Sequence, residues 1–381
     1  MALAGRGESP RILQVFVPGA AGGLESVVVM LARGLREAGV PVAVSAVLEP
    51  EAPLPASVRA LQEAGLEVFC HAPAHRAYLR ERQLHEDTIR RWGAQVIHTH
   101  GYRADLLAGS AAARLERARA ATVHGFTGGD WKNRLYERLQ LRSFRRFDAI
   151  LAVSRPIRDR LLSVGIADVR IAVVPNAWSS ARPLLSREAA RSALGIAPGA
   201  RAIGWVGRLS QEKGADILLD AMSLVGDPAI EASFLGDGSL RASLEARALA
   251  LGVSRRIRWH GIVPDAGEYA TAFDCFVLSS RTEGTPIALL EAMAGGVPVV
   301  TTAVGGVPDI VSEAEALLVP SENPGALARA IAEVFAAPEA AAVRASRARA
   351  RLAEQFAPAP WINRHREIYR DILAFRRGEN A

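Results

Sequence analysis

Short apolar segments alternate with longer amphipathic segments along most of the chain. Residues 12–17 form the first apolar run, a glycine-rich loop follows at 19–23, and an amphipathic helical pattern covers 24–38. Buried parallel strands read as apolar runs and the helices between them are amphipathic, so this rhythm predicts β-α-β units. Six more apolar runs in the first half have the length of strands: 42–48, 67–70, 95–99, 121–124, 149–153 and 171–174.

A turn-rich segment at 175–198, which contains Pro175 and Pro183, interrupts this rhythm and marks a domain boundary. The alternation then restarts with six strand candidates: 202–206, 232–235, 257–260, 275–278, 297–301 and 317–319. A helical pattern at 339–351 should be broken by Pro358 and Pro360 before a last amphipathic helix. The pattern predicts an α/β protein with two doubly wound parallel sheets, which bind ligands beyond the carboxyl ends of their strands.

The composition narrows the class of protein. The chain has 381 residues, enough for two domains, and its 50% hydrophobic and 23% charged residues are typical of a globular protein. The net charge is +6, and all but Lys132 and Lys213 of the 46 basic side chains are Arg. This scattered charge favours anionic ligands in general and argues against nucleic acid as the partner. Cys70 and Cys275 are far apart, which argues against a structural zinc site and for a reducing cytoplasm.

Neither an export signal nor a membrane span is predicted. Arg6, Glu8 and Pro10 interrupt the N-terminal segment where a signal peptide needs an apolar core. The longest uncharged stretch, 292–308, contains four glycines and two prolines, which a membrane-spanning helix would tolerate poorly. We therefore expect a cytoplasmic protein that is soluble or attached to the inner face of a membrane from one side.

The strongest chemical signal lies at 279–300, after the strand candidate 275–278. Thr285 and Pro286 suit the N-cap and first position of a helix, whose free N–H groups bind anions such as phosphate. Glu283 precedes this helix and Glu291 lies within it, so two carboxylates can address the two ends of one extended ligand. Alone, two such glutamates would be ordinary surface residues.

Other strand-end loops add cations and glycines to this signal. Arg208 follows the strand candidate 202–206, and Lys213 comes five residues later. The glycines of these loops are Gly207, Gly214, Gly236, Gly238, Gly305 and Gly306. Two cations at the carboxyl end of a strand would suit an anionic ligand.

These motifs, in this order and spacing, resemble those of the nucleotide-sugar-dependent retaining glycosyltransferases of family 4. The first half adds further matches: Gly22-Gly23, His98-Thr99-His100, Val123-His124-Gly125, Ser154 and Val174-Pro175-Asn176. The resemblance implies the GT-B fold, in which two Rossmann-like domains face each other across a cleft. We expect an N-terminal domain over 1–177 on the acceptor side, onto which 358–381 crosses back, and a nucleotide-sugar-binding domain over 178–357.

The resemblance also implies which residues form the site. The catalytic residues would be His124, Arg208, Lys213 and Glu283, with the two cations on the diphosphate and the histidine near the reacting carbon. The donor-binding residues would be Gly22, Gly23, Gly207, Gly236, Gly238, Gly284, Thr285, Pro286, Ile287 and Glu291. Of these, Glu291 would accept the ribose hydroxyl protons. His98 and His100 would lie on the acceptor side.

The reaction so implied is retaining transfer of a hexose-type sugar from a nucleotide diphosphate sugar to an acceptor hydroxyl. It would serve the synthesis of a cell-surface polysaccharide, glycolipid or glycoconjugate. No metal and no cofactor are expected, because the chain has no Asp-x-Asp motif and Arg208 and Lys213 can neutralise the diphosphate. The acceptor would be a sugar, a lipid-linked molecule or a small molecule, and the donor base stays open.

Several residues depart from the commonest family pattern, namely Ala177, Ser279, Ser280, Thr285 and Asp309. These departures weaken any assignment of the donor. A nicotinamide dehydrogenase is not favoured, because 19–23 lacks the G-x-G-x-x-G spacing, and no lysine follows the glycines of a P-loop. A nucleotide-sugar 2-epimerase of the same fold and a catalytically silent nucleotide-sugar binding protein are the alternatives.

The segment 131–147 has the pattern of a basic amphipathic helix. It places six cations among four large apolar residues: Lys132, Arg134, Arg138, Arg142, Arg145 and Arg146 among Leu135, Leu139, Phe144 and Phe147. Such a helix suits the surface of an anionic membrane, although an ordinary solvated helix face is more common. Peripheral membrane contact through 131–147 is therefore left open.

Overall fold

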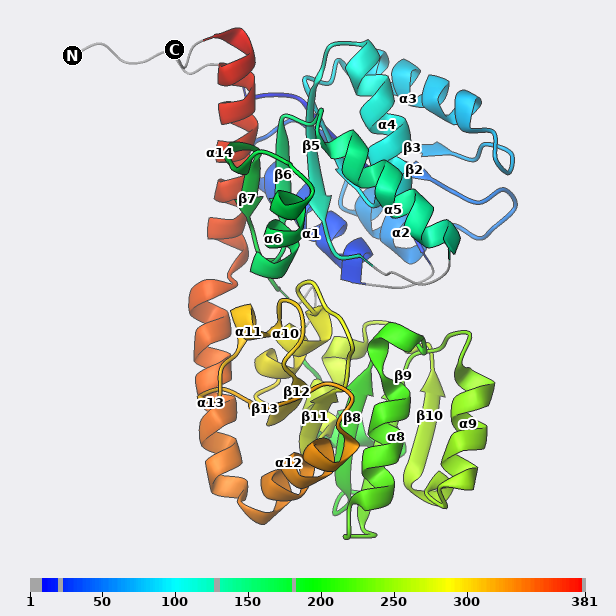
Figure 1. The fold of residues 1–381 in the computed structure, drawn as a ribbon, viewed down its shortest axis with the longest axis vertical. Coiled ribbons are helices and arrows are strands. Elements are labelled where there is room, and N and C mark those ends of the chain that lie inside the picture. The colour runs from blue at the N-terminus through cyan, green and yellow to red at the C-terminus, as the bar shows by residue number, and fades with distance from the viewer. Residues whose placement is uncertain (1–8, 20–22, 127–130, 180–182, 379–381) are drawn as a thin grey trace, which may run out of the picture. The chain divides into compact units, whose positions relative to one another are not determined.

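The computed structural model describes residues 9–19, 23–126, 131–179 and 183–378. It consists of two compact units (Figure 1). Unit 1 comprises Met1–Pro175 and Pro358–Ala381, and unit 2 comprises Asn176–Ala357. Each unit is built on one parallel sheet with helices on both faces, as the alternating pattern of the sequence predicts.

Unit 1 contains a seven-stranded sheet of order β3-β2-β1-β4-β5-β6-β7. Its strands are β1 (Ile12–Phe16), β2 (Val42–Val47), β3 (Glu67–His71), β4 (Val96–His100), β5 (Ala118–Val123), β6 (Ala149–Ala152) and β7 (Ile171–Val173). Its helices are α1 (Gly23–Glu37), α2 (Ala56–Glu63), α3 (Tyr78–Trp92), α4 (Tyr102–Arg114), α5 (Trp131–Phe144), α6 (Arg155–Ser163) and α14 (Pro358–Arg377). A short 3-10 helix, η1 (Asp168–Arg170), precedes β7.

Different helices cover the two faces of the unit 1 sheet. Leu13 and Val15 of β1 pack against apolar residues of α3 and α4. Gln14 lies beside His98 of β4 in the sheet register and, by strand alternation, points to the opposite face. On that face Tyr369 of α14 approaches His98 to 2.7 Å, so the last helix of the chain packs on the sheet of unit 1.

Unit 2 contains a six-stranded sheet of order β10-β9-β8-β11-β12-β13. Its strands are β8 (Arg201–Val206), β9 (Ile230–Leu235), β10 (Ile257–Gly261), β11 (Cys275–Leu278), β12 (Val299–Thr302) and β13 (Leu317–Val319). Its helices are α7 (Arg187–Ala193), α8 (Ala215–Leu224), α9 (Arg241–Ala250), α10 (Ile287–Ala294), α11 (Val307–Ile310), α12 (Pro324–Ala336) and α13 (Pro338–Gln355). Three 3-10 helices, η2 (Gln211–Lys213), η3 (Ser254–Arg256) and η4 (Ala266–Ala272), complete it.

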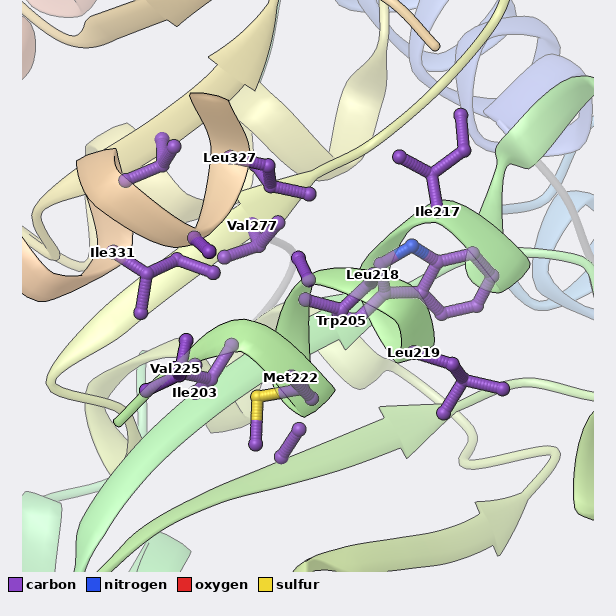
Figure 2. Packing of buried hydrophobic residues seen from close by; sticks show 14 of the residues in the cluster. Ile203, Trp205, Ile217, Leu218, Leu219, Met222, Val225, Val277, Leu327 and Ile331 are labelled. Atoms are coloured by element: carbon purple, nitrogen blue, oxygen red, sulfur yellow. The ribbon is translucent and has the colours of Figure 1, made fainter. Parts of the chain in front are cut away.

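The core of unit 2 fixes its two central strands. Figure 2 shows Ile203 and Trp205 of β8 and Val277 of β11 packed against residues of α8 and α12. The other face packs against α10 and α13 through a second cluster that includes Phe276 of β11. Because β8 and β11 are buried on both sides, the positions of their carboxyl ends are well determined by the core.

Every predicted strand is present, with ends within three residues of the prediction. Two predictions about prolines are wrong in detail. Pro358 and Pro360 do not precede α14 but lie in its first turn. The N–H groups of a first turn have no carbonyl partner within the helix, so proline there costs no hydrogen bond. Pro286 does not occupy the first helical position, because α10 begins one residue later at Ile287.

Helix α5 does not expose all the apolar residues of the segment 131–147. Leu135 and Leu139 are exposed, whereas Phe144 and Phe147 are buried in the core of unit 1. The apolar face expected for membrane contact is therefore narrower than the sequence pattern indicates. Among the helices in the described part of the chain, none is both long enough and apolar enough to cross a bilayer.

Candidate functional site

An ion pair joins the loops that follow β8 and β11. Lys213 Nζ lies 2.8 Å from Glu283 Oε1 and 2.9 Å from Oε2, and the Ser280 hydroxyl donates to Oε1 at 2.6 Å. The glutamate side chain is 5% exposed and the lysine side chain 25%. Strand order reverses between β8 and β11, and in such sheets the crevice at the reversal is where ligands bind. Two residues predicted for the site thus meet there.

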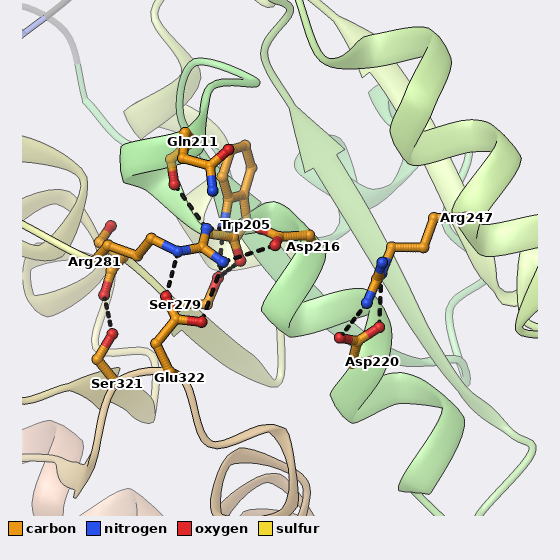
Figure 3. A network of polar contacts seen from close by, with 11 residues as sticks. Trp205, Gln211, Asp216, Asp220, Arg247, Ser279, Arg281, Ser321 and Glu322 are labelled. Atoms are coloured by element: carbon orange, nitrogen blue, oxygen red, sulfur yellow. Dashed lines mark hydrogen bonds and ion pairs between the residues drawn. The ribbon is translucent and has the colours of Figure 1, made fainter. Parts of the chain in front are cut away.

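Arg281 ties these loops together (Figure 3). Its guanidinium donates to both oxygens of Asp216 at 2.8 and 2.7 Å and to the Gln211 carbonyl oxygen at 2.7 Å. It also forms an ion pair with Glu322, which follows β13. The hydrogen bonds to Asp216, followed by those to Glu322, raise the pKa of Arg281 further above its usual range. The backbone N–H of Arg281 donates to the Glu212 carbonyl oxygen at 2.8 Å, so one residue connects three strand-end loops.

Two glycines allow the loops to pack without side chains between them. Gly214 has φ +62°, and a Cβ there would lie 2.0 Å from the Ser279 carbonyl oxygen. Gly236 has φ +144°, and a Cβ there would lie 1.8 Å from the Gly207 carbonyl oxygen. Any other residue at either position would push the loops apart.

The remaining predicted residues of unit 2 lie on the same strand-end loops. Arg208 is exposed, two residues after the end of β8. Gly238 packs against the backbone of Leu209, where an added Cβ would come within 2.5 Å of the carbonyl oxygen. The residues from Gly284 to Pro286 are buried between Glu283 and the start of α10. The N–H groups of Leu289 and Leu290 donate to the Pro286 carbonyl oxygen, which leaves those of Ile287 and Ala288 at the start of the helix to hold an anion.

Glu291 of α10 lies against η4. A Cβ added to Gly267 would come within 2.6 Å of Glu291 Oε1, so the carboxyl group packs on bare backbone. Burial, and to a smaller extent the charge of Asp265, raise the pKa of Glu291 to about 7. Donors of hydrogen bonds, such as ligand hydroxyls, would favour the ionised form of this carboxyl group.

In unit 1, His98 is fully buried. Its Nδ1 lies 2.7 Å from the Tyr369 hydroxyl and its Nε2 lies 2.8 Å from the Thr122 hydroxyl. Burial holds the pKa of His98 well below its usual range, so the ring is neutral. Both ring nitrogens therefore have partners inside the protein, which points to a packing role beneath α14 rather than to contact with an acceptor.

His100 and His124 form a neighbouring pair. His100 Nδ1 lies 3.2 Å from His124 Nε2, and His100 Nε2 is buried with no hydrogen-bond partner in the described residues. A buried N–H without an acceptor is costly, so the tautomer with the proton on His100 Nδ1, donating to His124, is favoured. Burial, and secondly the charge of His365, lower the pKa of His124 to about 4. His124 is then neutral and carries its own proton on Nδ1.

The loop after β1 is only partly described. Gly22 lies outside the described residues, and Gly23 is the first residue of α1. The N–H of Gly19 donates to Glu25 Oε1 at 2.7 Å, which ties the start of this loop to the first turn of α1. Across residues 9–19, 23–126, 131–179 and 183–378, no group of three or more His, Cys, Asp or Glu residues is arranged to hold a metal ion.

Sequence reasoning missed the role of Arg281. The signal available was indirect: Arg281 lies two residues before Glu283, and its partner Asp216 lies three residues after Lys213. The Lys213 motif and the Glu283 motif therefore each contain one residue of the Arg281–Asp216 pair that joins them. Because Arg281 and Asp216 are 65 residues apart, the sequence alone does not show that they meet.

Comparison with known proteins agrees with this architecture. The family described as glycosyltransferase family 4 matches residues 21–182, and that described as glycosyl transferases group 1 matches residues 186–351. The 2-deoxystreptamine glucosyltransferase of Streptomyces kanamyceticus is 30% identical over 68% of this chain and 73% of its own length. The chain belongs to glycosyltransferase family 4, as its motifs predict.

Two further proteins define the extent of the likeness. The 2-deoxystreptamine N-acetyl-D-glucosaminyltransferase of Streptomyces fradiae is 33% identical over 63% of this chain, but the match spans only 62% of that relative. The structure of HepE from Anabaena in complex with UDP-glucose is 21% identical, covers 96% of this chain and 100% of its own, and has a TM-score of 0.82. The fold is therefore GT-B, which confirms the predicted fold class.

Proposed function

We propose that this protein is a retaining glycosyltransferase that moves a hexose-type sugar from a nucleotide diphosphate sugar to an acceptor hydroxyl. Its product would be a cell-surface polysaccharide, a glycolipid or another glycoconjugate. The observation that carries the proposal is the Lys213–Glu283 pair, a partly exposed cation on a buried carboxylate where strand order reverses. Relatives named as glycosyltransferases and a neighbour that binds UDP-glucose support this choice.

Donor binding would exchange the partners of this pair. The diphosphate would take the place of the Glu283 oxygens around Lys213 Nζ, and exposed Arg208 would add a second cation. Glu283, released from the lysine, would accept hydrogen bonds from the sugar hydroxyls. Negative charge on the diphosphate grows as the glycosidic bond breaks, so both cations would contribute most in the transition state.

The other predicted residues would orient the donor. Glu291 would accept the ribose hydroxyl protons, and the α10 N-terminus would hold phosphate oxygens. Neutral His124 would donate a hydrogen bond from Nδ1 to the donor sugar. The acceptor proton would pass to the leaving phosphate oxygen on the same face of the sugar, which keeps the configuration of the anomeric carbon.

We also propose that turnover needs no divalent metal, because Lys213 and Arg208 would neutralise the leaving diphosphate. The test is turnover in excess EDTA, which we expect to match turnover in buffer. Loss of turnover in EDTA that manganese restores would contradict this proposal.

A peripheral membrane contact through α5 is a further part of the proposal. Leu135 and Leu139 are exposed, and Arg134, Arg138 and Arg142 are exposed on the same helix. Exposed leucines beside arginines suit the surface of an anionic bilayer. We expect co-sedimentation with vesicles containing phosphatidylglycerol but not with phosphatidylcholine vesicles, and loss of binding when the three arginines are replaced by glutamine.

The deciding experiment incubates the protein with UDP-, GDP- and ADP-sugars and measures released nucleoside diphosphate, with Lys213→Ala as the matched control. We expect release from one donor class, strong dependence on an added acceptor, and an α product from an α donor by NMR of the anomeric centre. A sugar of changed configuration at carbon 2 without any acceptor would instead identify a 2-epimerase. Tight nucleotide binding without turnover would identify a silent binding protein.

A further inference from the structure

Three tyrosines gather at the carboxyl edge of the unit 1 sheet. Tyr102 is the first residue of α4 and follows β4, the strand beside β1 where the order of this sheet reverses. Tyr136 of α5 stacks on it, with ring centroids 5.4 Å apart and planes 23° from parallel. Tyr78 begins α3, and side-chain hydrogen bonding with Tyr136 raises the pKa of Tyr78. We call Tyr78, Tyr102 and Tyr136 the tyrosine cluster.

Two of the three residues of the tyrosine cluster are exposed, and Tyr136 is partly buried. Tyr102 is 50% exposed and Tyr78 is 43% exposed. The whole chain has only five tyrosines, so three of the five lie in this one place. Tyrosine is enriched among the residues that dominate binding interfaces, so exposed rings that pack together at a strand-end edge point to a binding surface.

A buried carboxylate fixes a guanidinium beside the cluster. Arg103 follows Tyr102 in α4, and its Nη2 donates to Glu81 Oε2 at 2.6 Å and its Nε to Oε1 at 3.0 Å. The Glu81 side chain is 1% exposed and the Arg103 side chain is 29% exposed. This pair joins α3 to α4 and holds one partly exposed cation next to the stacked rings.

A second buried carboxyl group fixes α5. The Gln140 amide of α5 donates to Asp105 Oδ2 of α4 at 2.6 Å, and the Thr99 hydroxyl of β4 donates to Oδ1. The three helices that supply the tyrosines are thus held together by polar contacts inside the unit. The stacked rings are preorganised, which lowers the entropy lost when a ligand binds.

The chemistry of the cluster selects its ligand. The faces of tyrosine rings suit the C–H face of a saturated ring, and the hydroxyls and the guanidinium suit hydroxyl groups at its rim. We propose that the tyrosine cluster binds a polyhydroxylated ring, a sugar or a cyclitol, as the acceptor of the transfer. This inference rests on the proposed function, which supplies the need for an acceptor.

The test uses the five tyrosines as probes. Protein labelled with 3-fluorotyrosine gives fluorine NMR signals that single Tyr→Phe variants assign. The ligands are myo-inositol and the methyl glycosides of glucose, galactose, mannose and N-acetylglucosamine, each added with and without a nucleoside diphosphate. We expect at least one ring to shift the cluster signals and to leave those of Tyr269 and Tyr369 in place.

Variants then separate stacking from overall structure. Tyr102→Ala should weaken binding of the shifting ring about tenfold, whereas Tyr102→Phe, which keeps the ring, should bind nearly as wild type. Leu79→Ala, at an exposed apolar residue beside Tyr78, is the matched control and should change nothing. Nucleoside diphosphate affinity should be unaltered in all three variants.

Two outcomes would overturn the inference. Cluster signals that respond to phosphatidylglycerol vesicles but to none of the rings would assign this surface to a membrane. Equal ring binding by Tyr102→Ala and wild type would remove the cluster from the acceptor site. Failure to bind any nucleoside diphosphate would be a different result, because it would refute the proposed function whatever the cluster does.

Discussion

The Lys213–Glu283 site of unit 2 and the histidines at the strand ends of unit 1 are of opposite character. In unit 2 the residues are charged and, apart from buried Glu283, at least partly exposed, with Lys213 paired to Glu283 and Arg281 joined to Asp216 and Glu322. In unit 1, His98 and His100 are buried and neutral, and their neighbours are other histidines and hydroxyl groups. The same sheet topology thus supports an ionic site in one unit and a neutral, buried network in the other.

The difference separates ligand-binding groups from packing groups. A partly exposed cation can exchange its carboxylate partner for a phosphate, so the unit 2 network can change on binding. Fully buried His98 already has both nitrogens occupied and has nothing left to exchange. We therefore expect variants of the unit 2 site to change activity most, and variants of the buried histidines His98, His100 and His365 to change stability most.

The largest expected effect is on Lys213. Replacing it with Ala removes the cation from the diphosphate site and leaves Glu283 buried without its partner. Turnover should fall by a factor that corresponds to about 2 to 5 kcal/mol. Lys213→Arg should also be damaging, because a planar guanidinium cannot reproduce one compact ammonium between two oxygens. Rates at saturating and limiting donor measure both variants.

A thermal melt is the control for these two variants. A large drop in melting temperature for Lys213→Ala would attribute the lost rate to unfolding. Near-normal turnover of Lys213→Arg would refute the geometric argument, and near-normal turnover of Lys213→Ala would exclude this lysine from the site.

Stability should depend on pH through His365, a buried residue of α14 whose ring centroid lies 5.9 Å from that of His98. Burial lowers the pKa of His365 to about 4, well below the ordinary value that it regains on unfolding. As the pH falls from about 6.5 to 4, the unfolded chain binds a proton that the folded chain does not, so the free energy of unfolding falls. The loss from His365 is on the order of 3 kcal/mol. Above pH 7 this contribution is fully present.

The measurement compares wild type with His365→Phe in chemical unfolding at several pH values. Burial raises the pKa of Asp105 to about 7, so this residue makes the folded state more stable as the pH falls and opposes the effect of His365. Both proteins contain Asp105, and the difference between them therefore isolates the histidine. The stability of His365→Phe relative to wild type should rise as the pH falls. Parallel pH profiles would show that this histidine does not titrate on unfolding.

Arg281 should affect turnover indirectly, because it positions the strand-end loops that hold the catalytic residues. Arg281→Ala frees three strand-end loops from one another, and we expect turnover to fall by roughly 10- to 100-fold with a smaller change in donor KM. Arg247→Ala is the matched control, because Arg247 makes an equally close pair with Asp220 on the surface of the same unit (Figure 3). Equal turnover rates for the two variants would show that Arg281 contributes no more to catalysis than a surface ion pair does.

The smallest effect concerns Glu291. With its pKa raised to about 7 by burial and Asp265, part of the population is protonated at neutral pH. Nucleotide-sugar affinity should therefore rise as the pH increases from 6 to 8, by up to about tenfold. Glu291→Gln should bind weakly with no pH dependence in this range. Calorimetric titration measures the affinity of wild type and of the variant at each pH. If the affinity of Glu291→Gln depends on pH in the same way as that of wild type, Glu291 is not part of the site.

Much of the fold was predictable because local pattern decides it. Each parallel strand is an apolar run, so its position follows from the sequence without tertiary information. Lys213 and Glu283 were also predictable, since both follow strands and match family motifs. The ends of helices were harder to predict. A proline such as Pro286 or Pro360 is tolerated both in the first turn of a helix and just before it, so the sequence does not fix the first helical residue.

The partners of side chains could not be predicted in the same way. The contacts of Arg281 depend on three loops meeting, and the burial of His98 depends on Tyr369, which lies 271 residues away. The sequence of a histidine motif is the same whether its rings bind a ligand or pack beneath a helix, so the motif alone does not distinguish the two roles. The tyrosine cluster also arises only when three helices are placed side by side.

The central claim is that the Lys213–Glu283 pair binds a ligand and is not merely a structural ion pair. The most direct test is the exchanged variant Lys213→Glu with Glu283→Lys, compared with Lys213→Glu alone and with wild type. A melt first verifies that the exchanged variant is folded. We expect it to release no nucleoside diphosphate from any UDP-, GDP- or ADP-sugar that wild type uses, because the cation has moved to the wrong loop. Recovery of turnover in the exchanged variant over Lys213→Glu would contradict the claim and make the pair structural.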